Sequence, residues 1–339
     1  MPRLDDLAVS PVPPASRDVH TNVVIAADDG VELIGDLYVP PGEPPFPAVV
    51  EITPYNARHL ATLGDIYAAR GFVFLAVDVR GRYRSAGAWE PLLHDRRDGH
   101  AVINWLAAHP LCNGRVGSRG HSYSGYNQLL AAIDAPRSLQ AMVVGVAPGD
   151  VFDNVPFQGG AYDLSDLMWL MGMTGRVCSD ETDAEDLSDA RLGLIADSTV
   201  DYAEVEPDSA APAQVPDCDD HHFAAGDLLR RALTARPFRD VDLRLGIRHD
   251  ILREWLAHWR GDAYWRARSV GDRLHRSAVP TLHISGWWDS NSRGSTSKLT
   301  VSSACLSHSR LGTLASCRSA PSPPAKAISA AATASPPSL

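Results

Sequence analysis

The sequence predicts an α/β fold with a mostly parallel, doubly wound sheet, and three observations indicate it. Continuous apolar runs, typical of strands that are buried on both faces, alternate with segments of helical periodicity. Gly, Pro or Asp ends most of these runs. Strands that alternate with helices at this spacing favour β-α-β units and parallel pairing.

The elements are expected in a definite order along the chain. Residues 22–27 and 31–39 form two strand-like runs, and Asp28-Asp29-Gly30 between them is a strong hairpin signal. The chain therefore opens with an antiparallel pair. The later predicted strands are 47–53, 72–77, 115–118, 139–146 and 279–285, and the predicted helices are 59–70, 95–109 and 124–133.

Composition divides the 339 residues into four parts. Residues 1–150 are the first part of the α/β core, and 271–300 return to it. Between them, 151–270 are expected to form a mainly helical inserted cap, acidic and interrupted by prolines over 179–220. Residues 301–339 are rich in Ser, Ala and Pro, a composition that predicts a tail unable to pack.

Charge and cysteine usage exclude several classes of partner. The net charge of -10 would repel nucleic acid and anionic membranes, and no apolar run approaches the ~18 residues that span a bilayer. The beginning of the chain lacks the basic and apolar regions of a signal peptide. Five scattered cysteines indicate neither a disulfide framework nor a zinc cluster. We therefore expect a cytoplasmic protein without metal or cofactor.

The segment Gly117-Ser118-Arg119-Gly120-His121-Ser122-Tyr123-Ser124-Gly125 lies between a short predicted strand and a helix. It resembles a nucleophile elbow, whose small residues allow a strained turn to present the serine. The usual pattern places its second glycine two residues after the serine, whereas Ser124 occupies that position here and Gly125 follows. The alternative is a Gly/Ser-rich loop that caps a helix.

Further motifs occur in the order of one enzyme family. They are Asp78-Val79-Arg80-Gly81-Arg82-Tyr83-Arg84-Ser85-Ala86-Gly87, Asp98-Gly99-His100, Trp105 to Gly117 and Gly120-His121-Ser122-Tyr123-Ser124-Gly125. Thr53-Pro54-Tyr55 and Gly286-Trp287-Trp288-Asp289 extend the match. From about residue 20 to 295 the chain resembles the cocaine esterase and X-Pro dipeptidyl-peptidase group of α/β-hydrolases. That group also includes α-amino acid ester hydrolases and cephalosporin acylases.

The resemblance implies a role for four residues. Ser122 matches the nucleophile, Tyr123 the residue whose backbone N–H holds the oxyanion, Tyr55 the second oxyanion donor, and Asp289 the acid of the triad. Without the resemblance, Tyr55 could equally be a rim aromatic near a Pro turn, and Asp289 could start a turn. The Asp78-Val79-Arg80 segment is at least as typical of an ion pair that braces a loop.

The catalytic histidine is the part of the family pattern that this sequence lacks. Relatives carry it in a Gly-Pro-Trp-x-His-Gly type segment after the acid, and His308 is the only histidine that follows Asp289 here. His121 is adjacent to the nucleophile around a sharp turn and should point away, whereas His283 reads as a core residue. The family's C-terminal β-sandwich has no counterpart either. We therefore expect a truncated chain whose sequence beyond about residue 295 is frameshifted or otherwise misread.

These patterns predict a serine hydrolase that cleaves an ester or amide bond of a small molecule or short peptide through an acyl-enzyme on Ser122. The acidic residues of 180–189 could recognise a substrate amine or simply be solvated. Ligands of a metal are not expected from 216–222, because consecutive residues rarely converge on one ion. A non-catalytic ligand-binding relative and an inactive fragment are the alternatives, and the oligomeric state is left open.

Overall fold

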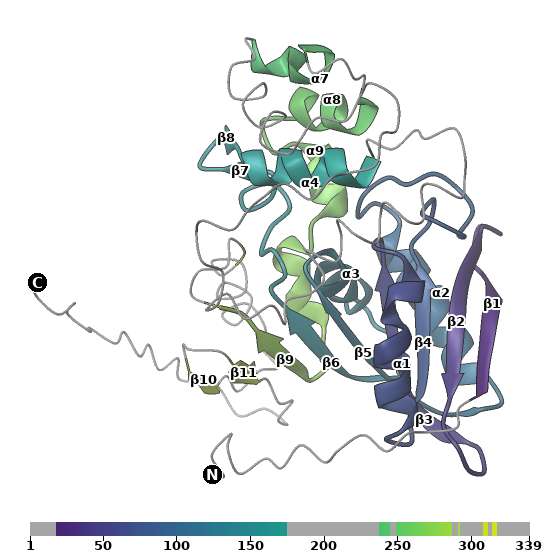
Figure 1. The fold of residues 1–339 in the computed structure, drawn as a ribbon. Coiled ribbons are helices and arrows are strands. Elements are labelled where there is room, and N and C mark those ends of the chain that lie inside the picture. Colours follow the sequence, from purple (N-terminus) through teal and green to yellow (C-terminus); the bar gives the residue numbers. More distant parts are fainter. Residues whose placement is uncertain are drawn as a thin grey trace, which may run out of the picture.

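The computed structural model describes residues 18–174, 237–244, 249–286, 291, 308–310 and 314–316. Among these residues a nine-stranded sheet of order β1-β2-β4-β3-β5-β6-β9-β11-β10 forms the centre of the molecule (Figure 1). The strands are β1 (Asp18–Ala26), β2 (Glu32–Val39), β3 (Phe46–Thr53), β4 (Val73–Asp78), β5 (Cys112–His121), β6 (Leu139–Gly145), β9 (Thr281–Ile284), β10 (His308–Arg310) and β11 (Leu314–Ser316).

The middle of the sheet is parallel and its two margins are antiparallel. β4, β3, β5, β6 and β9 pair in parallel, whereas β1, β2, β11 and β10 join through antiparallel pairs. The chain passes from β3 to β4 on one side and then crosses to β5 on the other side of β3. The carboxyl ends of β3 and β5 therefore flank the point where the winding reverses, the usual place for a ligand in such sheets.

The predicted opening hairpin is confirmed. β1 and β2 pair in antiparallel register from Ala26–Glu32 outward. Gly30 in the turn has a φ of 82°, a left-handed conformation that glycine adopts without steric cost. The predicted parallel core strands and the helices that follow them are also present, each shifted at its ends by a few residues.

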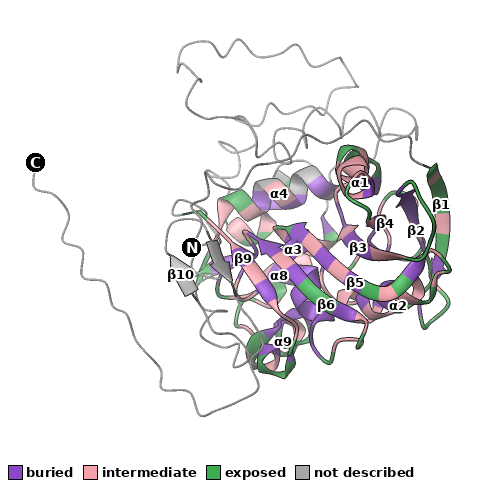
Figure 2. Ribbon diagram, turned by 90° about the horizontal axis from the view of Figure 1, so that it is seen from below, coloured by how far each residue is buried: buried purple, intermediate pink, exposed green. Residues whose placement is uncertain are grey.

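Helices cover both faces of the sheet, as a doubly wound topology requires. The helices are α1 (Ala61–Ala68), preceded by the 3₁₀ turn η2 (Ala57–Leu60), on one face, and α2 (Asp95–Ala108) and α3 (Tyr123–Ala131) on the other. The residues of β4 are all buried (Figure 2), and their side chains alternate between the two faces of the sheet. Its Phe74 and Ala76 pack with the residues around α1, and Val73, Leu75 and Val77 belong to the larger core with α2 and α3.

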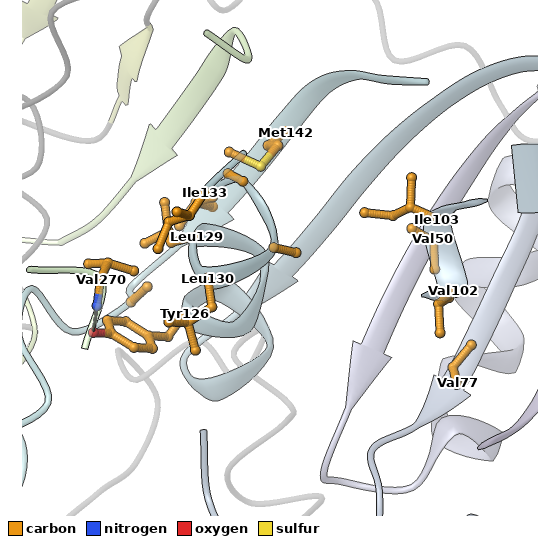
Figure 3. Packing of buried hydrophobic residues seen from close by; sticks show 14 of the residues in the cluster. Val50, Val77, Val102, Ile103, Tyr126, Leu129, Leu130, Ile133, Met142 and Val270 are labelled. Carbon is orange, nitrogen blue, oxygen red and sulfur yellow. Dashed lines mark hydrogen bonds between the residues drawn. The ribbon is translucent and has the colours of Figure 1, made fainter. Parts of the chain in front are cut away.

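The larger core holds the elements near the candidate site in place. Leu129 and Leu130 of α3 are almost fully buried, and Figure 3 shows them beside Tyr126, whose hydroxyl accepts a 2.8 Å hydrogen bond from the Val270 N–H. Burial of such side chains contributes roughly 1.5–3 kcal/mol each. This packing fixes α3 against the segment that returns to the sheet.

The described part of 151–270 lies beyond the carboxyl ends of the parallel strands (Figure 1). It contains the hairpin β7 (Phe157–Gln158) and β8 (Ala161–Tyr162), the 3₁₀ turn η4 (Phe238–Asp240), and the helices α4 (Leu164–Thr174), α7 (Val241–Arg244), α8 (Asp250–Ala257) and α9 (Ala263–Arg268). The 3₁₀ turn η5 (Gly271–Arg276) follows it and leads to β9. The predicted acidic stretch and the 216–222 segment lie outside the described residues. No helix in the described part has the length and apolarity that a membrane crossing needs.

Candidate active site

Ser122 occupies a strained turn between β5 and α3. Its φ of 54° and ψ of −121° fall in a region that costs a non-glycine residue about 1–3 kcal/mol and persists only where neighbours hold it. Three backbone hydrogen bonds do so: the Ser122 N–H donates to the Gly145 carbonyl at 3.0 Å, and its carbonyl accepts from the Gly125 and Tyr126 N–H groups at 3.0 and 2.9 Å. The side chain therefore stands at the carboxyl end of β5.

The small residues around Ser122 have individual steric reasons. A Cβ on Gly120 would clash with the carbonyl oxygen of Ser124, and a Cβ on Gly125 would lie 2.8 Å from the carbonyl oxygen of Gly145. Because Gly120 leaves this space, the turn accommodates Ser124 two residues after Ser122, where the usual pattern has glycine. The departure from the pattern is thus compensated within the same turn.

Tyr55 brings a hydroxyl to Ser122 from the neighbouring strand end. It follows β3, its N–H donates to Thr53 Oγ1 at 3.1 Å, and its hydroxyl donates to Ser122 Oγ at 3.5 Å. Burial raises the pKa of Tyr55, and contacts with Ser122, the Trp169 indole and the Tyr123 N–H partly offset the rise. Tyr55 therefore stays protonated at neutral pH, and its hydroxyl lies next to the Tyr123 N–H.

Tyr123, the first residue of α3, has a buried side chain that reaches away from Ser122. Its hydroxyl donates to Asp95 Oδ2 at 3.1 Å and accepts from the Leu92 N–H at 2.8 Å. Its ring lies against Trp89 and Trp169, each at a centroid distance of 6.3 Å. The sequence does not single out Asp95 as a neighbour of Tyr123, because the helix dipole already accounts for an acid in the first turn of a helix.

Two of the predicted site residues remain to be accounted for. Asp289 lies outside the described residues. His308 begins β10, and β11, β9 and β6 lie between β10 and β5. Four strand spacings of about 4.8 Å separate the His308 backbone from β5 by roughly 19 Å. This backbone placement argues against direct contact between His308 and Ser122.

The two other histidines near the site have structural surroundings. His121, the last residue of β5, is within 2.6 Å of an Arg119 guanidinium nitrogen through its Nδ1. A Cβ on Gly145 would collide with the His121 ring, so the imidazole lies against that strand. His283 is buried in β9, as expected for a core histidine.

The charged motif after β4 forms ion pairs, as the structural interpretation of the sequence predicts; one of them, Arg84 with Asp78, lies within the motif, and the other partners come from elsewhere in the chain. The Arg80 guanidinium makes two hydrogen bonds to Asp98, at 2.6 and 2.8 Å, and two to Asp29, at 2.9 and 3.0 Å. Arg84 binds Asp78 at 2.9 Å and Asp36 at 2.8 Å. These bonds tie the loop after β4 to the opening hairpin and to α2.

The strand order and the positions of Ser122 and Tyr55 agree with a comparison of the sequence with known protein families. A family model described as X-Pro dipeptidyl-peptidase (S15 family) matches residues 29–303. The chain belongs to the S15 family. The resemblance inferred from the sequence motifs is thereby confirmed, and so is the α/β-hydrolase fold.

Relatives of this S15 family chain are longer than the chain itself. The cocaine esterase of Rhodococcus sp. (strain MB1 Bresler) is 29% identical over 282 residues, which are 80% of this chain and 44% of the esterase. A CocE/NonD family hydrolase from Staphylococcus aureus has a TM-score of 0.57 at 20% identity and covers 84% of this chain and 44% of its own. An α-amino acid ester hydrolase has a TM-score of 0.59 at 20% identity, and the match covers 88% of this chain and 48% of the hydrolase. The chain thus spans less than half the length of these relatives.

Proposed function

We propose that this S15 family chain is a serine hydrolase that cleaves an ester or amide bond, including that of a short peptide, through an acyl-enzyme on Ser122. The observation that supports this most is the convergence of the Ser122 and Tyr55 hydroxyls and the Tyr123 N–H at the carboxyl ends of β3 and β5. A nucleophile beside two hydrogen-bond donors is the arrangement that acyl transfer requires.

In the proposed reaction, Ser122 Oγ forms a bond to the substrate carbonyl carbon and transfers its proton to a base. The negative charge moves to the carbonyl oxygen, which accepts hydrogen bonds from the Tyr55 hydroxyl and the Tyr123 N–H. Collapse of this intermediate breaks the bond to the leaving alcohol or amine, which takes the proton. Water then attacks the acyl-enzyme in the same way and frees Ser122.

The base and its orienting acid remain predictions from the family pattern. Asp289 is expected to orient a histidine, which is either His308 or absent from this sequence. The substrate class is supported by the surroundings of the proposed oxyanion site, where Trp169 of α4 contacts both Tyr55 and the Tyr123 ring and supplies apolar surface. An acyl group with an apolar body suits these neighbours better than a charged one.

A non-catalytic role is the second candidate, and the backbone placement of His308 is the observation that favours it. A chain that keeps the oxyanion donors without a base would bind an ester-like or peptide ligand and release it unchanged. Substrate turnover distinguishes the two roles directly.

The test is hydrolysis of p-nitrophenyl esters and of an X-Pro p-nitroanilide by the purified chain, by Ser122→Ala and by Ser124→Ala. Ser124 is the matched control, because its hydroxyl is buried next to Ser122 and has no hydrogen-bond partner among the described residues. We expect Ser122→Ala to lose about 10³-fold or more in kcat and Ser124→Ala to retain it. Equal rates for the chain and Ser122→Ala, or ligand binding without turnover, would overturn the proposal.

A further inference from the structure

The hydroxyl of Tyr123 is held by two groups from outside its own helix. The Leu92 N–H donates to it at 2.8 Å, and it lies 3.1 Å from Asp95 Oδ2. Tyr123 has only 6% of its surface exposed, so water does not compete for these bonds. Because the Leu92 N–H already donates to the phenol oxygen, the phenol proton points to Asp95.

Asp95 differs from Asp98 and Asp29 in having no cationic partner among the described residues. Asp98 and Asp29 both bind the Arg80 guanidinium, whereas the one side-chain hydrogen bond of Asp95 among the described residues comes from Tyr123. Its Oδ1 is buried and has no partner in the described part of the chain. A carboxyl group is costly to bury in this state, so its retention calls for an explanation beyond stability.

The Leu92 backbone adds a second sign that this contact is specific. Leu92 has a φ of 64°, which is uncommon for a residue with a bulky side chain. In this conformation its N–H points at the Tyr123 hydroxyl. The strained Leu92 and the strained Ser122 thus lie on either side of Tyr123, one bonded to its side chain and the other to its backbone.

The position of the Tyr123 N–H is what this anchor controls. The N–H belongs to the residue that directly follows Ser122, so a rotation of Tyr123 moves the proposed oxyanion donor and the serine together. Misplacement of a reacting group by about 1 Å can cost on the order of 100-fold in rate. A hydrogen bond at the far end of the rigid tyrosine ring resists such a rotation.

We propose that Asp95 is a positioning residue that acts through the Tyr123 side chain to hold the Tyr123 N–H and Ser122 in the geometry for acyl transfer. The inference rests on the proposed function. The hydrogen-bond acceptor on Asp95 carries the effect, and its charge does not. Asparagine, which keeps an acceptor oxygen of the same reach, should therefore replace it and alanine should not.

The experiment compares kcat and KM on a p-nitrophenyl ester for Asp95→Ala, Asp95→Asn, Tyr123→Phe and the double variant Asp95→Ala/Tyr123→Phe. We expect Asp95→Ala and Tyr123→Phe each to lower kcat about 10-fold with KM within about 2-fold. Asp95→Asn should keep most of the rate. The double variant should be no slower than the slower single variant, because both changes remove one interaction.

Three outcomes would overturn this inference. Asp95→Ala and Tyr123→Phe with the kcat of the parent chain would show that the anchor has no effect. Losses in kcat that add in the double variant would show that the two side chains act independently. A loss in kcat for Asp95→Asn as large as that for Tyr123→Phe would show that the acceptor oxygen does not carry the effect. If Asp95→Ala does not fold, the kcat values of Tyr123→Phe and Asp95→Asn decide: the inference requires a loss in the first and a retained rate in the second. Absence of any Ser122-dependent hydrolysis in the parent chain would instead end the proposed function, and this inference with it.

Discussion

Two neighbouring regions of this molecule, one after β4 and one after β3 and β5, carry many polar residues and use them in different ways. After β4, the guanidinium groups of Arg80 and Arg84 each bind two carboxylates. After β3 and β5, uncharged groups from Tyr55, Ser122 and Tyr123 converge. Both segments belong to the family motifs, yet the first braces the fold, whereas the second is the one that we propose to meet a substrate.

The two regions differ in how many of their polar groups are already hydrogen-bonded within the protein. The hydrogen-bonding capacity of Arg80 and Asp98 is used within the protein, so these groups have little left to offer a ligand. Ser122 keeps a hydroxyl whose only side-chain contact among the described residues is a long one of 3.5 Å, on a backbone that needs support from its neighbours. Hydrogen-bond donors that lack a strong partner and lie on a strained backbone are better indicators of a reactive site than a high density of charged residues is.

Removing the cation of the bracing motif should have the largest effect. Arg80→Met leaves Asp98, whose side chain is 6% exposed, without its partner, and loss of one member of a buried pair costs about 3–5 kcal/mol. Urea unfolding followed by circular dichroism measures the loss. Arg80→Met/Asp98→Asn is the control, since it also removes the stranded charge and should recover part of the stability. A loss below about 1 kcal/mol in Arg80→Met would show that the pair is not structural.

Removing one of the converging hydroxyls should affect rate and leave stability nearly unchanged. Tyr55→Phe deletes the proposed oxyanion donor, and loss of one such donor typically costs about 10²–10³-fold in kcat. The steady-state rate on a p-nitrophenyl ester, measured beside the urea midpoint, separates the two effects. Tyr67→Phe serves as the matched control, because Tyr67 stacks on Phe74 on the α1 side of the sheet, away from Ser122. An unchanged kcat in Tyr55→Phe would remove Tyr55 from the mechanism.

The carboxyl group without a cation should be visible in the pH dependence of stability. Burial, with Asp98 second, raises the pKa of Asp95 from 3.8 to about 7. Between these values the folded chain keeps a proton that the unfolded chain has lost, so this group makes stability fall as pH rises, by up to about 1.4 kcal/mol per pH unit. Asp95→Asn should make the dependence less steep from pH 4.5 to 7 in urea unfolding, while Glu51 and Asp166, whose pKa values burial also raises to about 7, still contribute to it. The slope of the parent chain in the variant would contradict the raised pKa.

The groups that face Asp95 do not account for the same change. They are Asp98 on α2, Tyr123 on α3, and Arg80, Glu90 and His94 around the small cavity that Asp95 also lines. All of them remain in Asp95→Asn. The difference between the parent chain and the variant therefore isolates the titration of Asp95.

The smallest effect is expected at the far margin of the sheet. His308→Ala should leave the esterase rate within about 2-fold, because four strand spacings of roughly 4.8 Å separate its backbone from β5. A loss comparable with that of Ser122→Ala would identify His308 as the base. It would also contradict the placement of β10.

Much of the fold could be predicted because its signals are local. Apolar runs and turn residues at Asp28-Asp29-Gly30 gave the core strands and the opening hairpin, and the Gly117 to Gly125 segment located the turn at Ser122. Proximity between distant segments could not be read in this way. The sequence does not show that Arg80 reaches Asp29 and Asp98, or that Tyr123 reaches Asp95, because those contacts depend on how the strands and helices pack.

The most direct test of the account is labelling of the folded chain with a fluorophosphonate probe, followed by mass spectrometry of the peptides. The account predicts a single adduct on Ser122, absent from Ser122→Ala, present in Ser124→Ala and formed more slowly in Tyr55→Phe. An adduct on Ser124, or no adduct in a chain with the circular dichroism of a folded protein, would contradict the claim that β3 and β5 present an activated serine.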